Sequence, residues 1–539
     1  MVEHRVRIII TQVRLKQALL TVLAGVAWAA LGGAQARPLP ERVQPHPVAS
    51  AVGELAAGLA RELRQPAPRL DLRLCRAATD LARVLPDDAT HPGGSLVAEA
   101  LALHGIVEPS PDMMLSGFSP GHERELLEGL RKPLREALAK GRWRLLGVGV
   151  VPVSATRLRV LVLMLESFIE LDPLPRSAPV GEAPIVLRGR LLPPFSRPQV
   201  LITTPAGQVE RVPGTTDGTR FQATMRCLVR GRYQIEVLGE DRHGSTVLAN
   251  FPIYCGQEAP RELGAPAGVG GPVVHTAREA EQQLLVLLNA DRARFGLPPL
   301  VWDERLAQVA RNHSLDMRTG GFVGHVSPRT GSARDRVARA QIDTVVLLEN
   351  VARAYSPQQV QQALMDSPGH RANILDKSVT HAGIGVELVP SPGGPPELWV
   401  TQLLMRPMPP FDSDRVQEQT LLRVQALRAQ QGLGHLQTDA ALSRLAGEIA
   451  RRVADGQLPA ERVGEPAQQA LGQFAGRYRL LRTVLAVTND PGELAPAKSL
   501  LDRKVTHIGI GAAPVPRTPE HRAAAIYLVL VLAQGWGQG

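Results

Sequence analysis

The feature that most constrains this chain is an internal repeat. Residues 285–325 align with residues 421–461 without a gap, at an offset of 136 positions. Such self-similarity means that one folding pattern is built more than once. Identical residues at corresponding positions carry the match: Leu285/Leu421, Gly296/Gly432, Leu297/Leu433, Leu300/Leu436, Asp303/Asp439, Leu306/Leu442, Ala310/Ala446 and Gly320/Gly456.

Two further stretches extend the repeat. Residues 380–385 (THAGIG) correspond to residues 506–511 (THIGIG), and a fainter third match lies nearer the N-terminus. The third match pairs Asp71, Leu74 and Ala78 with Asp303, Leu306 and Ala310, and Gly147-Val-Gly149 with Gly383-Ile-Gly385. A chain of 539 residues is too long for one core. We therefore predict three copies of one domain, at residues 50–172, 275–407 and 414–535.

The predicted copies mix helices and strands. In the middle copy, residues 279–295 and 303–319 have apolar residues at helical spacing, and residues 381–388 and 398–405 read as strands. The first copy reads as helix, helix and then buried strands. Helices and strands within about 130 residues predict a layered α/β fold.

The segment between the first two copies has a different texture. Residues 176–256 form short strand-like runs separated by turn residues at 205–207, 217–218 and 243–244, which predicts an inserted all-β sandwich. Residues 257–274 are rich in Gly, Pro and Ala and read as a linker. Cys227 and Cys255 bracket the β-rich segment and would be free to pair in an oxidising compartment, or would be two separate buried thiols. Cys75 reads as a small core residue on a helix.

The N-terminus is typical of a secretory signal. Positive residues between Arg5 and Lys16 precede an apolar run, Ala18–Leu31, and Ala34-Gln-Ala36 fits the small-residue cleavage rule. The run is shorter than the roughly 20 residues that span a bilayer. We expect a cleaved signal peptide at 1–36 and a Pro-rich tether at 37–49. The mature protein would be secreted or periplasmic, with no membrane span after signal cleavage.

Charge and composition narrow the partners. The net charge is +10, which permits attraction to anionic surfaces such as cell-wall polymers or lipid headgroups. Lys and Arg form no block, aromatic residues make up only 4% of the chain, and no phosphate-cradling Gly-x-x-x-x-Gly-Lys segment occurs. The two Gly-x-Gly segments lead into strands rather than helices. Nucleic-acid binding is therefore not expected.

A frame of polar residues lies in the middle copy: His325, Glu349-Asn350 and His370. Histidine and glutamate suit joint proton handling or metal binding near neutral pH. The last copy lacks both histidines, because Glu461 stands at the position of His325 and Asp490-Pro-Gly-Glu493 replaces Ser367-Pro-Gly-His370. A frame needed only for folding would not be lost in a sister copy, so we expect the middle frame to have a function.

These residues, in this order, resemble the CAP superfamily (SCP-like: cysteine-rich secretory proteins, antigen 5 and pathogenesis-related class 1 proteins), in its cysteine-free bacterial branch. The resemblance also rests on Leu300-x-Trp302-Asp303 and on the Arg-x-Asn-Ile-Leu run after His370. It implies an α-β-α sandwich with a central cleft, flanked here by degenerate CAP-like copies. In that family two histidines and one or two glutamates line the cleft, and some members hold a divalent metal there. Carried over, these are His325, His370 and Glu349; a second glutamate has no clear counterpart, Asp366 being the nearest acidic residue, and Leu348 replaces the usual glycine.

The chemistry of this set leaves alternatives open. Two imidazoles and a carboxylate are a ligand set for a divalent metal such as zinc with one open position, whereas a metal-free polar cleft fits equally. Asn350 would orient the cleft or cap a loop, and Arg371 would grip an anion or be solvated. We predict an exported, non-enzymatic protein whose cleft binds a small ligand, lipid or divalent metal. The alternative is an extracytoplasmic metal-dependent hydrolase.

Overall fold

The computed structural model describes residues 46–86, 92–109, 111–264, 274–390, 395–516 and 525–536. The predicted signal peptide, the tether up to residue 45 and residues 265–273 of the predicted linker lie outside these ranges. Helix α1 begins at Pro47, inside the stretch predicted as tether, and the His46 ring caps it by accepting from the Val48 amide at 3.2 Å. Within the described ranges, no helix has the length and apolar character to cross a bilayer.

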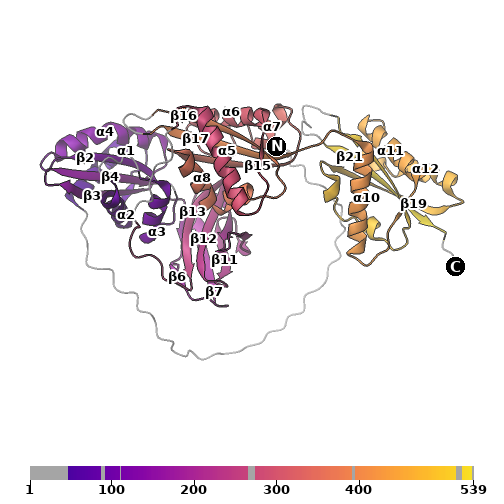
Figure 1. The fold of residues 1–539 in the computed structure, drawn as a ribbon, viewed down its shortest axis with the longest axis horizontal. Coiled ribbons are helices and arrows are strands. Elements are labelled where there is room, and N and C mark those ends of the chain that lie inside the picture. Colours follow the sequence, from indigo (N-terminus) through magenta and orange to yellow (C-terminus); the bar gives the residue numbers. More distant parts are fainter. Residues whose placement is uncertain are drawn as a thin grey trace, which may run out of the picture. The chain divides into compact units, whose positions relative to one another are not determined.

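The N-terminal unit has a four-stranded sheet with the strand order β1-β3-β4-β2. Figure 1 labels β2, β3 and β4 of this sheet together with the helices α1 to α4. β1 runs parallel to β3, and the other two pairings are antiparallel. Its elements are α1 (Pro47–Glu62), β1 (Arg69–Leu70), α2 (Leu72–Val84), α3 (Gly94–Leu103), β2 (Asp112–Phe118), α4 (Glu123–Lys140), β3 (Leu145–Ser154) and β4 (Arg157–Leu165).

The middle unit has the corresponding order β14-β16-β17-β15, again with one parallel and two antiparallel pairings. Its elements are α5 (Ala277–Arg294), β14 (Val301–Trp302), α6 (Glu304–Gly320), α7 (Ala333–Arg339), β15 (Thr344–Ala354), α8 (Pro357–Asp366), α9 (Pro368–Ile374), β16 (His381–Val389) and β17 (Glu397–Pro407).

The C-terminal unit has the order β18-β20-β21-β19 with the same strand directions. Its elements are α10 (Ser413–Ala429), β18 (Gln437–Thr438), α11 (Ala440–Ala454), η1 (Ala460–Arg462), α12 (Glu465–Phe474), β19 (Tyr478–Thr488), η2 (Pro491–Glu493), η3 (Lys498–Leu501), β20 (His507–Pro514) and β21 (Ile526–Gly535).

The middle unit is an α-β-α sandwich, with helices packed on both faces of its sheet. Successive residues of a strand point to opposite faces, so one strand contributes to both layers of the core. On β17, Val400 and Leu404 pack with α5 and α8, whereas Leu403 and Met405 pack with α6 and α7. The outer units also have one hydrophobic cluster on each face of their sheets. The fold class is therefore α/β, with CAP-like units on either side of the middle one.

The recurring Gly-x-Gly segments have a packing role. A Cβ atom on Gly383 would lie 2.3 Å from the Ala307 amide nitrogen of α6, and one on Gly385 only 2.0 Å from that of Arg311. Gly509 and Gly511 meet α11 in the same way, and Gly147 and Gly149 meet α2. Each helix thus packs directly on the strand backbone, which only glycine permits.

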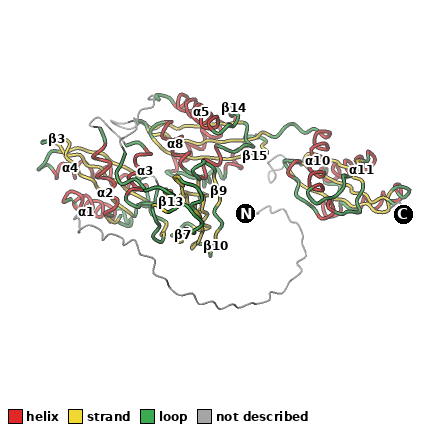
Figure 2. The backbone as a smooth tube through the Cα atoms, turned by 60° about the horizontal axis from the view of Figure 1, so that its bottom comes forward, coloured by secondary structure: helices red, strands yellow, loops and turns green. Residues whose placement is uncertain are grey.

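The inserted domain is a β-sandwich of a four-stranded sheet, β10-β11-β7-β5, and a five-stranded sheet, β6-β13-β12-β8-β9. Figure 2 shows the stretch labelled β7 and β10 as strand and loop. Its strands are β5 (Ile169–Leu171), β6 (Ser177–Ala178), β7 (Pro184–Leu191), β8 (Ser196–Thr203), β9 (Val209–Arg211), β10 (Gly214–Thr216), β11 (Arg220–Arg226), β12 (Gly231–Asp241) and β13 (Gly244–Cys255).

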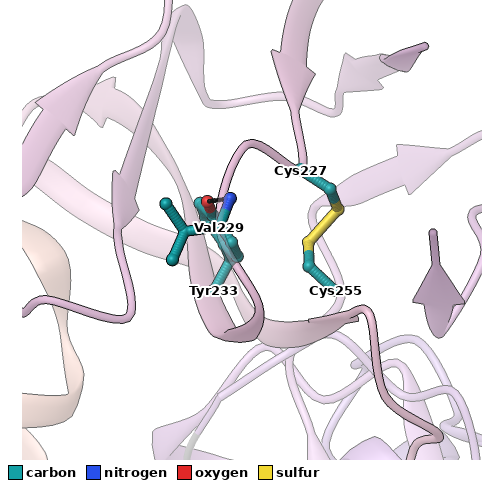
Figure 3. The surroundings of a disulfide bond; sticks show 4 residues. All are labelled: Cys227, Val229, Tyr233 and Cys255. Atoms are coloured by element: carbon teal, nitrogen blue, oxygen red, sulfur yellow. Dashed lines mark hydrogen bonds between the residues drawn. A yellow bond between two sulfur atoms is a disulfide. The ribbon is translucent and has the colours of Figure 1, made fainter. Parts of the chain in front are cut away.

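A disulfide joins the two sheets of the sandwich. Cys227 follows β11 of one sheet and Cys255 ends β13 of the other, with their Cα atoms 5.5 Å apart (Figure 3). Beside it, the Tyr233 hydroxyl accepts from the Val229 amide at 3.1 Å. Cys75 is a buried free thiol on α2.

The start of the sandwich differs from the sequence prediction. β5 pairs with β7, and Phe168 and Ile169 belong to the sandwich core, although the sequence assigned residues up to 172 to the first copy. A three-residue strand that follows β4 after a short break gives no pattern of its own, so its partner sheet could not be read from the sequence.

Candidate functional site

The site starts from a buried ion pair in the middle unit. Glu349 lies on β15 and Arg336 on α7, and both side chains are almost fully buried. Arg336 donates a short hydrogen bond to Glu349 Oε2, and its Nη1 donates to the Gly331 carbonyl at 2.6 Å. His325, in the loop after α6, places Nδ1 3.0 Å from Glu349 Oε1. Both carboxylate oxygens are therefore occupied.

The charge state of Glu349 follows from these contacts. Burial acts to raise the pKa of the carboxyl group, but the hydrogen bond from His325 and the positive charge of Arg336 outweigh it, so the pKa lies below its usual value. Because an ionised carboxylate only accepts hydrogen bonds, His325 must donate from Nδ1. In the neutral form of the ring, Nε2 then carries a lone pair.

His370 is the second histidine of the site and lies on α9. Its ring centroid is 6.4 Å from that of His325, and its Nδ1 is 2.8 Å from the Ser367 hydroxyl. Burial, with a smaller contribution from His325, lowers the pKa of His370 to about 3, so this imidazole is neutral at physiological pH. In the described part of the chain, neither ring has a hydrogen-bond partner at Nε2.

Amide side chains support this arrangement from within the sheet. Asn350 is fully buried and donates to Gln402 Oε1 at 3.2 Å. Asn373 of α9 donates to Asn350 Oδ1 at 2.9 Å and to the Glu349 carbonyl at 3.1 Å. Asn350 therefore ties the histidine-bearing helix to the glutamate-bearing strand rather than facing a ligand.

The side chain of Arg371 contacts the β-sandwich and Phe295. Its Nε donates to the carbonyl of Gly207 in the β-sandwich at 3.0 Å, and its guanidinium stacks over Phe295 at 4.8 Å. From the sequence we expected this residue either to grip an anion beside the cleft or to be solvated. Its contacts instead make it part of the surface between the middle unit and the sandwich.

A residue that the sequence analysis missed reaches the site from the sandwich. Glu236 on β12 is fully buried; its Oε1 accepts from the Gly369 amide at 2.8 Å, and its Oε2 accepts a short hydrogen bond from Ser367. Burial raises the pKa of Glu236 to about 7 in spite of both hydrogen bonds. Ile235 and Val237 face the sandwich core, so alternation predicts Glu236 on the outer face. The sequence gives no signal that this face is covered.

The sandwich also contacts the loop that carries His325. His243 stacks on Phe322 with ring centroids 4.8 Å apart, and its carbonyl accepts from the Val326 amide at 2.9 Å. Near the other histidine, Asn250 donates to the Asp366 carbonyl at 3.1 Å. The β-sandwich therefore contacts the segments that carry both histidines.

The frame does not form a three-ligand metal site. Among the described residues, no three His, Cys, Asp or Glu side chains are grouped so that they could hold a metal ion. Arg336 and His325 already occupy the oxygens of Glu349, and Ser367 occupies Nδ1 of His370. The donor set therefore does not fit a zinc centre with three protein ligands.

The other units lack these polar groups at equivalent positions of their sheets. The strand register, counted from the Gly-x-Gly segments, shows which residues of the outer units occupy the positions of Glu349, Asn350 and Gln402. Glu349, Asn350 and Gln402 correspond to Met113, Met114 and Val162 in the N-terminal unit, and to Thr483, Val484 and Leu530 in the C-terminal unit.

Comparison with known proteins finds a family match for the middle unit. The model of the cysteine-rich secretory protein family (CAP) matches residues 285–403. The chain is 38% identical over 110 residues to the uncharacterized membrane protein YlbC of Bacillus subtilis, covering 20% of this chain and 32% of that protein. It is 40% identical over 106 residues to the uncharacterized protein YkwD of the same organism, covering 20% and 41%. The chain thus spans less than half the length of either relative.

Solved structures give weaker similarities. An extracellular protein with an SCP domain from Bacillus anthracis is 21% identical, with 44% of this chain and 67% of that one covered and a TM-score of 0.22. An outer surface protein of Borrelia burgdorferi is 16% identical, with 25% and 96% covered and a TM-score of 0.22. Residues 285–403, which make up most of the middle unit, thus match the CAP family.

Proposed function

We propose that the middle unit is an exported binding module whose ligand is held between His325 and His370. The observation that carries this proposal is that both imidazoles bond through Nδ1 to groups of the protein, while Nε2 has no hydrogen-bond partner among the described residues. The lone pair on His325 Nε2 accepts hydrogen bonds. Such a site suits a ligand with hydroxyl or amino groups, as in cell-wall sugars and lipid headgroups.

The same contacts argue against hydrolysis. The pKa of Glu349 is lowered and both its oxygens are engaged, so this carboxylate is a poor general base. The serines nearest the histidines are buried: Ser327 donates to Asp316 Oδ2 at 2.6 Å, and Ser367 donates to Glu236. Neither hydroxyl is placed as a nucleophile.

The outer units would act as scaffold and surface. Their sheets have the same strand order, but the positions of Glu349, Asn350 and Gln402 are mostly apolar there. We propose that they are domains, the C-terminal one with the predicted bounds 414–535 and the N-terminal one ending before Phe168, which belongs to the sandwich core. We also propose that an anionic polymer binds to the surface of this basic chain. Export would follow from the signal-like N-terminus, and the similar proteins of B. anthracis and B. burgdorferi are described as extracellular and outer surface proteins.

The test is ligand binding by purified protein in which His325→Ala or His370→Ala is introduced. The probes are soluble peptidoglycan fragments and vesicles with anionic headgroups. His381→Ala is the matched control, because His381 bonds to the neighbouring Thr380 hydroxyl at 2.8 Å outside the site. Loss of binding at least tenfold in both site variants, but not in the control, supports the proposal.

Two outcomes would reject it. If neither site variant weakens binding of any probe, the histidines are not the binding site. If the parent protein cleaves peptidoglycan fragments or ester lipids and His325→Ala abolishes that cleavage, the hydrolase alternative replaces the binding module.

A further inference from the structure

Glu236 is an unusual residue for a contact between two domains. It is fully buried, lies 131 positions before Ser367 in the chain, and has no cationic partner among the described residues. A buried carboxylate without a cation is costly unless hydrogen bonds satisfy it. Both of its oxygens are satisfied by one short segment, through the Ser367 hydroxyl and the Gly369 amide. That segment leads directly to His370.

We infer that the β-sandwich completes the histidine site of the middle unit, with Glu236 as a positioning residue that fixes the tautomer of His370 through Ser367. The hydroxyl of Ser367 has one proton to donate. Because Ser367 donates its one hydrogen bond to the Glu236 carboxylate, the oxygen of Ser367 can only accept a hydrogen bond from His370 Nδ1. His370 then carries its proton on Nδ1 and a lone pair on Nε2. A hydrogen bond to one ring nitrogen sets the state of the other in this way at many histidine sites.

The C-terminal unit offers an internal comparison. Asp490 stands there at the position of Ser367, and its own Oδ1 accepts from the Gly492 amide at 2.9 Å. In the middle unit the corresponding amide, that of Gly369, is satisfied by the carboxylate of the sandwich. In the C-terminal unit, where no histidine follows, the aspartate of the segment itself therefore satisfies this amide. Serine at this position needs a carboxylate from elsewhere, but it can bond to His370.

The sandwich approaches the start of α9 closely enough to hold this geometry. A Cβ atom on Gly369 would lie 3.0 Å from Glu236 Oε1 and 3.5 Å from Leu201 on β8. Two hydrogen bonds fix the chain on both sides of His370: Arg371 donates to the Gly207 carbonyl, and Asn250 donates to the Asp366 carbonyl. Several strands and loops of the sandwich therefore hold Glu236, Ser367 and His370 in place.

The test is the tautomer of His370 in the full chain without ligand, read at mildly alkaline pH from the side-chain nitrogen shifts of ¹⁵N-labelled histidine. The His370→Gln spectrum assigns the signals. We expect the parent to be protonated at Nδ1. In Glu236→Gln, the glutamine keeps its acceptor for Gly369 and turns its amide to donate to Ser367, so Ser367 donates to Nδ1. The proton of His370 should then move to Nε2.

Glu240→Gln is the matched control, since Glu240 lies on the same strand and pairs with the exposed Arg197 at 3.1 Å; it should leave the tautomer unchanged. Ser367→Ala should give a mixture of both tautomers, and it decides the matter if Glu236→Gln does not fold. A parent protonated at Nε2, a Glu236→Gln spectrum like that of the parent, or a Ser367→Ala spectrum like that of the parent overturns the inference.

The inference rests on the proposed function only where it concerns a ligand, and the two fail separately. A tautomer that responds as expected in a protein that binds none of the probes rejects the binding module alone. Binding that depends on both histidines, with a tautomer that ignores Glu236, rejects the role of Glu236 alone.

Discussion

The middle and C-terminal units share a backbone but differ in chemistry. Both sheets have the same order, and Asp303 and Asp439 cap corresponding helices. Buried arginines also correspond: Arg292 donates to the Ile374 carbonyl at 2.7 Å, and Arg428 to the Leu500 carbonyl at 2.8 Å. Residues that hold the fold are therefore the same in both units.

What differs is confined to the polar site. Glu349 with its buried arginine partner corresponds to Thr483, whose buried hydroxyl has no hydrogen-bond partner among the residues that the structure describes. His370 and its serine are replaced by a segment in which Asp490 caps its own turn. The difference teaches that this fold does not require the polar set. The set costs desolvation energy in the middle unit, which a binding function would explain.

The largest expected effect comes from breaking the ion pair. Glu349→Ala leaves the buried Arg336 without its carboxylate and should destabilise the middle unit by about 3–5 kcal/mol. Thr483→Ala at the corresponding position removes an unpaired hydroxyl and should cost less than about 1 kcal/mol. Urea unfolding followed by hydrogen exchange of each unit measures both. Equal losses in the two variants would mean that the sites are equivalent after all.

The next effect should be the same in both units. Gly385→Ala and Gly511→Ala would each place a Cβ atom within about 2 Å of a helix backbone nitrogen, at 2.0 and 2.1 Å. Forcing the helix away from the strand should cost about 1–3 kcal/mol or more in either unit. Gly432→Ala is not a suitable control because its φ is +64°, whereas Gly472→Ala on α12 meets no atom within 4 Å. A loss in only one unit would contradict the shared packing.

A pH series sharpens the comparison at the sandwich. Because burial raises the pKa of Glu236 from 4.5 to about 7, the folded chain holds a proton between these values that the unfolded chain has released, so stability falls as pH rises through that window. Glu236→Gln removes this loss. The melting temperature of the variant minus that of the parent should therefore increase from about pH 5 to about pH 7 and then level off.

His370 titrates in the opposite sense, since its pKa falls from 6.5 to about 3 and stability is lost as pH decreases through that range. This contribution is present in both proteins and cancels in the difference. Scanning calorimetry at each pH gives the two melting temperatures. A difference that stays flat across the window would show that Glu236 does not titrate there.

Most of the fold could be predicted from residue spacing, but the environment of the site could not. Helices at 279–295 and 303–319 and strands at 381–388 and 398–405 occur within one or two residues of their predicted bounds, because amphipathic patterns report burial within one unit. The sequence named His325, Glu349 and His370. It missed Arg336, which resembles any arginine on a short helix, and Glu236, whose burial depends on contact between units far apart in the chain. Contacts of that kind leave no periodic signal.

The smallest expected effect concerns the histidine that recurs in both units. His381 bonds through Nδ1 to the Thr380 hydroxyl at 2.8 Å, and His507 bonds to Thr506 at 2.9 Å. Both bonds are exposed, so His381→Ala and His507→Ala should each change the free energy of unfolding by less than about 0.5 kcal/mol. Neither should alter ligand binding. Thermal unfolding with a binding assay checks both variants together. A loss of binding in His381→Ala alone would show that the polar site includes the start of β16. It would contradict the view that residues shared by the two units serve only the fold.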